Sequence, residues 1–124
     1  MNIQSFDPVI YPFKLWICIA NDFSDIESAF YNYDGTEISN LKNDVSNCEA
    51  FTIKVMDKQY NSYGALIVFR SKKRMSYEII AHECSHATKY LCDHCGIEID
   101  THEPFEYVIG WMAKCCGKVK NGVK

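Results

Sequence analysis

The sequence lacks the features of membrane-spanning and secreted proteins. No apolar run approaches the roughly 20 residues that a membrane-spanning helix needs. The first eight residues are not basic, and the apolar run 15–20 is too short for a secretory signal. The chain also has no repeat, linker or low-complexity segment. With 124 residues, it is expected to form one domain, residues 1–124, in the cytoplasm of the cell that makes it.

Charge and cysteine content further narrow the classes of protein to which this chain can belong. The net charge of −3 gives no reason to expect nucleic acid or an acidic membrane as a partner. The 7 cysteines are an odd number, which argues against a fully paired disulfide framework and predicts reduced thiols. The basic run 70–74 is predicted to be a solvated loop, and a nucleic-acid role is the less favoured alternative.

The first two-thirds of the chain predicts strands and one short helix. Alternating apolar residues predict strands at 9–20 and 51–55, and the continuous apolar run 63–69 predicts a strand covered on both faces. The short connection between the last two strands predicts a hairpin. Ser24 and Glu27 have the spacing of a capping box, which predicts a helix from 24 to about 33.

Two helices are predicted in the last third. Ser76 is a suitable cap for a helix that runs to about Leu91 or His94, and Gly96 ends it. A last helix is expected from about Thr101 to 116–117, followed by a frayed polar tail at 118–124. These elements predict an α+β fold in which a small antiparallel or mixed sheet packs on two helices.

The first of these helices contains the motif His82-Glu83-Cys84-Ser85-His86. Helix residues four apart lie on one face, so both imidazoles can bind one ion. This is the H-E-x-x-H arrangement of zinc hydrolases, in which the glutamate is the general base for a water on the metal. The alternative is that the three side chains are ordinary residues of a surface helix. Cys84 is expected to point away from the ion and to pack against another helix.

A catalytic zinc site needs a third protein ligand. His94 lies roughly 12 Å along the helix from His86 and cannot share the ion. Glu103 is favoured because it shares a face of the last helix with Tyr107 and Gly110. The alternatives left open by this pattern are Glu106, Asp100 and His102.

The motif, the apolar run 63–71 and the segment 103–111 together carry a resemblance. Most of the chain resembles small phage- and prophage-encoded metallopeptidases, which are minimal zincins of the gluzincin type. The resemblance implies a zincin-like fold in a bacterial host cell, with Zn²⁺ held by His82, His86 and Glu103. It is less specific before Asp22, and Glu106 stands where a small residue is expected.

The resemblance also implies a reaction. A zinc-bound water activated by Glu83 would attack a peptide or amide carbonyl, and Tyr107 or His102 would stabilise the oxyanion or orient a ligand. An exposed strand edge of the hairpin would hold the extended peptide. The alternative functions are a non-catalytic, metal-stabilised binding module in a phage–host interaction, and a regulator that binds nucleic acid through its basic loop.

The remaining cysteines suggest one further hypothesis. Cys92 and Cys95 have the C-x-x-C spacing, so with Cys115 and Cys116 they could form a second, structural zinc site. Adjacent cysteines do not reproduce the second half of a zinc ribbon. Buried or idle thiols are therefore the favoured interpretation.

Overall fold

The structure is a computed structural model that describes residues 3–99 and 102–122, without the side chain of His102. The strands are β1 (Gln4–Phe6), β2 (Lys14–Ile19), β3 (Phe30–Asn32), β4 (Ala50–Asp57) and β5 (Tyr63–Phe69). The helices are α1 (Ser24–Ala29), α2 (Leu41–Asp44), the 3₁₀ turn η1 (Lys72–Arg74), α3 (Tyr77–Cys95) and α4 (His102–Lys120).

The strands form one mixed sheet in the order β1-β2-β5-β4-β3. β2 and β5 are parallel, whereas the other neighbouring pairs are antiparallel. The predicted hairpin is confirmed as β4 and β5, and the α+β class is confirmed with it. Gly64 permits the close approach of β2 and β5, because a Cβ there would lie 2.3 Å from the carbonyl oxygen of Lys14.

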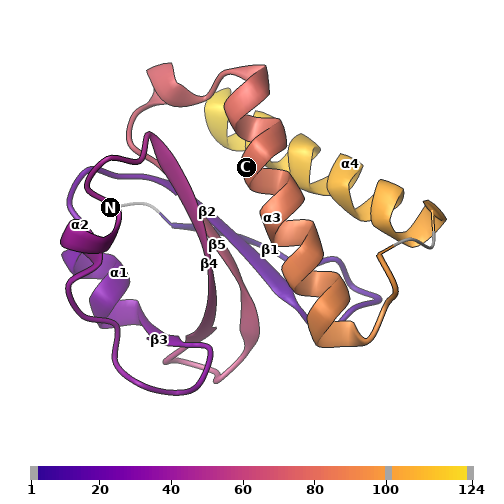
Figure 1. Ribbon diagram of the computed structural model, residues 1–124, viewed down its shortest axis with the longest axis horizontal. Helices are drawn as coiled ribbons and strands as arrows, with labels where there is room; N and C mark the ends of the chain where they lie inside the picture. The colour runs from indigo at the N-terminus through magenta and orange to yellow at the C-terminus, as the bar shows by residue number, and fades with distance from the viewer. Residues whose placement is uncertain (1–2, 100–101, 123–124) are drawn as a thin grey trace.

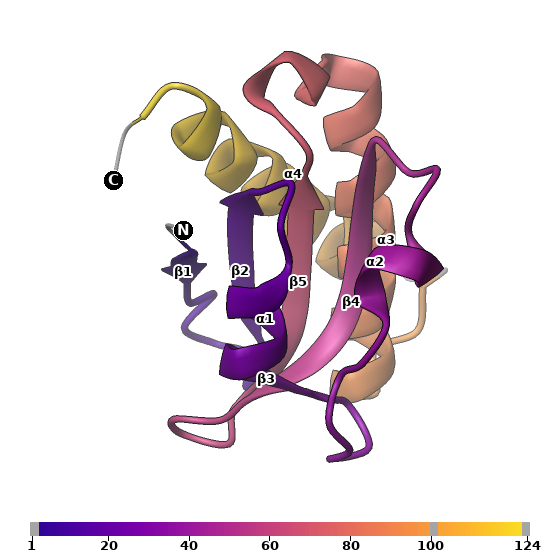
Figure 2. The same cartoon turned by 90° about the vertical axis from the view of Figure 1, so that its left-hand side faces the viewer.

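Helices cover both faces of the sheet. α3 and α4 lie on one face, and the short helices α1 and α2 lie on the other (Figures 1 and 2). β5 is buried on both sides, as its apolar run predicted: Ala65, Ile67 and Phe69 pack under α3 and α4, while Leu66 and Val68 face the other way. None of the described helices is long and apolar enough to cross a membrane.

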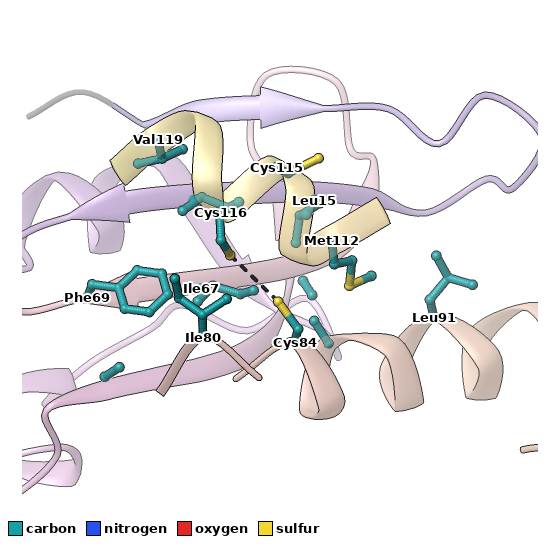
Figure 3. Packing of buried hydrophobic residues seen from close by; sticks show 14 of the residues in the cluster. Leu15, Ile67, Phe69, Ile80, Cys84, Leu91, Met112, Cys115, Cys116 and Val119 are labelled. Carbon is teal, nitrogen blue, oxygen red and sulfur yellow. Dashed lines mark hydrogen bonds between the residues drawn. The ribbon is translucent and has the colours of Figure 1, made fainter. Parts of the chain in front are cut away.

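The core under α3 and α4 fixes how these two helices meet. Figure 3 shows Cys84 of α3 facing Cys116 of α4, in the same core cluster as Ile67 and Leu15 of the sheet. The two sulfur atoms are 3.7 Å apart. One face of α3 is therefore sealed by α4, and the prediction that Cys84 serves packing is confirmed by its complete burial.

The first strand differs from its prediction. Residues 7–13 form a turn rather than a strand, with the Val9 N–H donating to the Asp7 carboxylate (2.8 Å) and Val9 at a φ of 70°. This turn reverses the chain, so that β1 pairs antiparallel with β2. The strand proper begins only at Lys14, after Pro12.

The helix predicted from 24 to about 33 is confirmed at its start and wrong after Ala29. α1 ends at Ala29, and Phe30–Asn32 become β3 because they pair with the end of β4. The capping box does not form either. Asp22 accepts the Ser24 N–H (3.0 Å), and the Glu27 carboxylate instead accepts the N–H of Leu41 (3.3 Å).

Both long helices were predicted with nearly correct starts. Ser76 caps α3 by accepting the Ile79 N–H (3.2 Å), and Gly96 ends it at a φ of 71°. α4 continues to Lys120, however, so the frayed tail predicted from 118 is wrong up to that residue. The extension follows from Val119, which is buried in the core. Residues 123–124 lie outside the described part.

Candidate metal centre

The two motif histidines converge on the exposed side of α3. Their Nε2 atoms are 3.2 Å apart, and their rings meet edge to face at a centroid distance of 4.8 Å. Two nitrogen ligands of a tetrahedral zinc ion, each about 2.0–2.1 Å from the metal, would be roughly 3.3 Å apart. The same separation suits a hydrogen bond between two neutral imidazoles. The pair thus fits one ion with little rearrangement.

Glu83 lies between the histidine pair and the sheet. Its side chain is only 6% exposed, and its Oε1 accepts a hydrogen bond from the Thr52 hydroxyl at 2.7 Å. A buried carboxylate is costly unless hydrogen bonds or a nearby positive charge compensate its lost hydration. One hydroxyl is a modest compensation. A cation at the adjacent histidines would add to it.

β4 presents an open edge beside these residues. β3 pairs with β4 only over Val55–Asp57, and within 3–99 and 102–122 no strand pairs with the same edge before Val55. The Arg70 N–H donates to Glu49, and the Asp57 N–H donates to Ser62, so the odd residues direct their backbone groups toward β5. The alternation of an antiparallel ladder then turns the backbone groups of the even residues Ala50, Thr52 and Lys54 toward the open edge.

Glu103, the favoured third ligand, is not brought to the histidine pair. α4 contacts α3 through Cys84 and through Thr88, whose Oγ1 lies 3.4 Å from Sδ of Met112. His82 and His86 each precede one of these contact residues by two positions, about 160° around the helix axis. The histidines therefore face away from α4.

The distance along α4 adds to this separation. Glu103 precedes Met112 by nine residues, roughly 13 Å of helix. α3 also continues for nine residues past His86 before Gly96 ends it, which carries the start of α4 away from the motif. The structure thus places Glu103 on the flank of α3 opposite to the histidines, away from a shared ion.

Tyr107 lies with Glu103 rather than with the histidines. Both line an apolar hollow of about 330 Å³ together with Pro8, Ile10, Tyr11, Pro104, Val108 and Trp111. The Tyr107 side chain is 75% exposed. Tyr107 is therefore grouped with Glu103 and not with the histidine pair. Of the alternatives, Glu106 belongs to the same helix, while Asp100 and the side chain of His102 lie outside the described residues.

Metal ligands do not gather elsewhere in the described part of the chain. No group of three His, Cys, Asp or Glu side chains there could hold an ion. The four-thiol site does not form, because Cys116 lies against Cys84, roughly 12 Å along α3 from Cys92. The hydrogen bond with Cys84 and burial raise the pKa of the Cys116 thiol, and burial raises the pKa of Cys115 to about 11. These thiols are neutral packing groups.

Two residues of the site were not recognised in the sequence. The alternation of 51–55 predicted that Thr52 and Lys54 share a face of their strand. It could not indicate that this face lies against the motif helix, because that depends on long-range packing.

His94 is kept from the ion, as expected. Its Nδ1 is 2.5 Å from the hydroxyl of Tyr33, and its ring packs against Phe13.

Comparison with known proteins adds no family to this description. No protein-family model matches the chain, and searches of curated proteins and of solved structures likewise return no match. The function is therefore inferred from the geometry of α3 and β4.

Proposed function

We propose that this protein is a metal-dependent hydrolase, with Zn²⁺ bound by His82 and His86 and with Glu83 as the general base. The observation that carries the proposal is the 3.2 Å separation of the two Nε2 atoms beside a buried carboxylate. Two histidines one turn apart can occur on any surface helix without a function. A buried glutamate beside them is costly without a cation or a catalytic use.

The chemistry follows from the residue types. Zinc, when bound, would polarise a carbonyl group and make a nearby water more acidic. Glu83 would take the proton of that water and pass it to the leaving amine. The Thr52 hydroxyl holds one carboxylate oxygen at 2.7 Å, which restricts the carboxylate to one orientation. A fixed base loses little freedom as the reaction proceeds.

The proposed substrate is an extended peptide. The open edge of β4 offers backbone donors and acceptors at Ala50, Thr52 and Lys54, next to Glu83. A peptide that pairs with this edge would pass beside the histidines. This arrangement supports a peptidase, and with it the proposed likeness to minimal zincins. A ligand from α4 forms no part of the proposal, because Glu103 lies on the far flank.

A non-catalytic, metal-stabilised binding module is the second candidate. It is favoured by the described ligand set, which contains two histidines rather than three protein ligands. Such a module would use the same edge of β4 to hold a partner strand. It has no use for Glu83 as a base, and this difference separates the two candidates.

The test compares the wild type with Glu83→Gln on zinc-loaded protein and a mixed peptide library. Glu83→Gln keeps the shape and the hydrogen bond from Thr52 but cannot take a proton. We expect it to retain zinc and to lose peptide cleavage. Glu78→Gln, an exposed change on the same helix, is the matched control and should retain both. Cleavage that persists in Glu83→Gln would remove Glu83 from the mechanism, and zinc binding without cleavage by the wild type would favour the binding module.

A further inference from the structure

Lys54 is the next residue after Thr52 to face α3 from β4. Its ammonium lies 4.6 Å from the ring centroid of Tyr33 and 5.4 Å from that of Tyr90. Within residues 3–99 and 102–122, Asp93 is the one carboxylate in ion-pair range, at the outer limit of 4.0 Å. The Asp93 side chain is 78% exposed, so this ion pair is loose and well hydrated. The two aromatic rings thus position the ammonium without neutralising it.

The position of Lys54 relative to the proposed base is set by the strand. Residues two apart on a strand point the same way and are separated by roughly 6.6 Å. Thr52 holds Glu83, and Lys54 lies one such step along β4 toward its carboxyl end. The Lys54 side chain is 32% exposed, so it is partly accessible to solvent.

We propose that Lys54 determines substrate specificity by pairing with an acidic side chain on the amino-terminal side of the cleaved bond. The inference rests on the proposed function, since it concerns a peptide held on β4. A bound strand places the side chain opposite Lys54 on the same face, within reach of its ammonium. This side chain lies two positions along the peptide from the one opposite Thr52, with one residue between them.

The direction of the peptide decides on which side of the cleaved bond the acid lies. Antiparallel pairing is more stable per residue than parallel pairing, so the bound peptide should run opposite to β4. Moving along β4 from Thr52 to Lys54 then means moving toward the amino terminus of the peptide. The acidic residue therefore precedes the scissile bond.

The experiment measures charge preference at each peptide position. A library places Glu, Gln or Lys at one position at a time, and kcat/KM is compared for the wild type, Lys54→Gln and Lys54→Glu. For the wild type we expect Glu over Lys by about three- to tenfold at one position before the cut. Lys54→Gln should abolish the preference and Lys54→Glu should invert it. The matched control is Lys114→Glu, an equal charge change on the exposed side of α4, which should keep it.

A binding assay separates this inference from the proposed hydrolysis. Fluorescence anisotropy of the same peptides on zinc-loaded Glu83→Gln protein reports charge preference without turnover. If no peptide is cut but acidic peptides bind in a Lys54-dependent way, the hydrolase proposal fails and the role of Lys54 stands. If peptides are cut or bound with a preference that Lys54→Glu leaves unchanged, the role of Lys54 is overturned and the hydrolase proposal is unaffected.

Discussion

The two flanks of α3 differ in almost every property that matters for chemistry. The flank toward α4 carries Cys84 and Thr88, which are completely buried against Cys116 and Met112. The flank toward β4 carries a solvent-exposed histidine pair and a buried glutamate that accepts a hydrogen bond from Thr52 of β4. One flank has the composition of a core, whereas the other combines ligands, a base and an open strand edge. Packing residues and the proposed catalytic residues therefore lie on different sides of one helix.

The largest expected effect is a loss of folding stability when a side chain packed against the α4 flank of α3 is truncated. Met112→Ala should lower the free energy of unfolding by about 2–5 kcal/mol, because it leaves a cavity between α3, α4 and the sheet. Urea unfolding monitored by circular dichroism measures this loss. Zinc affinity of the folded variant should stay at the wild-type value. A loss of zinc binding in a folded Met112→Ala protein would mean that the two flanks are not independent.

A matched pair of threonine variants compares the flanks directly. Thr52→Val removes the hydroxyl that holds Glu83 and should cost about 1–3 kcal/mol, since a buried carboxylate loses its partner. It should also lower peptide cleavage. Thr88→Val removes a hydroxyl that donates to the backbone oxygen of Cys84 (2.7 Å) and should leave cleavage by the folded protein unchanged. Equal losses of cleavage in the two variants would contradict the division between the flanks.

Alkaline pH should lower the free energy of unfolding through buried thiols in the two hydrophobic cores. Burial raises the pKa of Cys18 to about 12 and of Cys115 to about 11, above the ordinary value of 9.0. Unfolded thiols therefore release protons that the folded ones keep. The stability from this difference is fully present below pH 9 and falls as the pH rises from there toward the folded pKa values. Each such thiol contributes a slope of about 1.4 kcal/mol per pH unit.

Urea unfolding between pH 8 and pH 10.5 measures this slope. The pKa of Cys116 is also raised, by its hydrogen bond with Cys84 and by burial. Cys116→Ala should therefore make the decline less steep by one thiol's contribution. A slope that is the same in the wild type and in this variant would show that Cys116 ionises normally in the folded protein.

The smallest expected effect concerns the acid that the sequence favoured as a ligand. Glu103→Gln should change the free energy of unfolding by no more than about 0.5 kcal/mol, as for other exposed substitutions. Zinc affinity, measured by isothermal titration calorimetry, should be the same as in the wild type. A marked loss of affinity would restore Glu103 as a ligand and would require α4 to pack differently from the arrangement in Figure 1.

The sequence predicted those features that depend on local pattern. The caps at Ser76 and Gly96, the apolar strand β5 and the β4–β5 hairpin all follow from residue type and spacing. The histidine pair belongs to the same group, because helical geometry alone brings residues four apart together.

The features that depend on packing between distant segments were missed. Phe30–Asn32 form a strand rather than the end of the predicted helix, because they pair with β4. The choice of a third ligand also depends on packing, and the structure does not bring Glu103 to the histidine pair. The pattern of the last helix showed which of its faces is apolar, but not which flank of α3 that face would cover. Thr52 and Lys54 were overlooked because their importance comes only from the helix that lies beside them.

The most direct test of the account is zinc binding by the histidine pair. Isothermal titration of zinc into metal-free protein should give about one site per chain for the wild type. His82→Ala and His86→Ala should each lose it, while His94→Gln, which removes the histidine held by Tyr33, should keep it. Circular dichroism would verify that each variant is folded. Zinc binding that is absent in the wild type, or unaffected by either alanine substitution, would show that the histidine pair is not a zinc site.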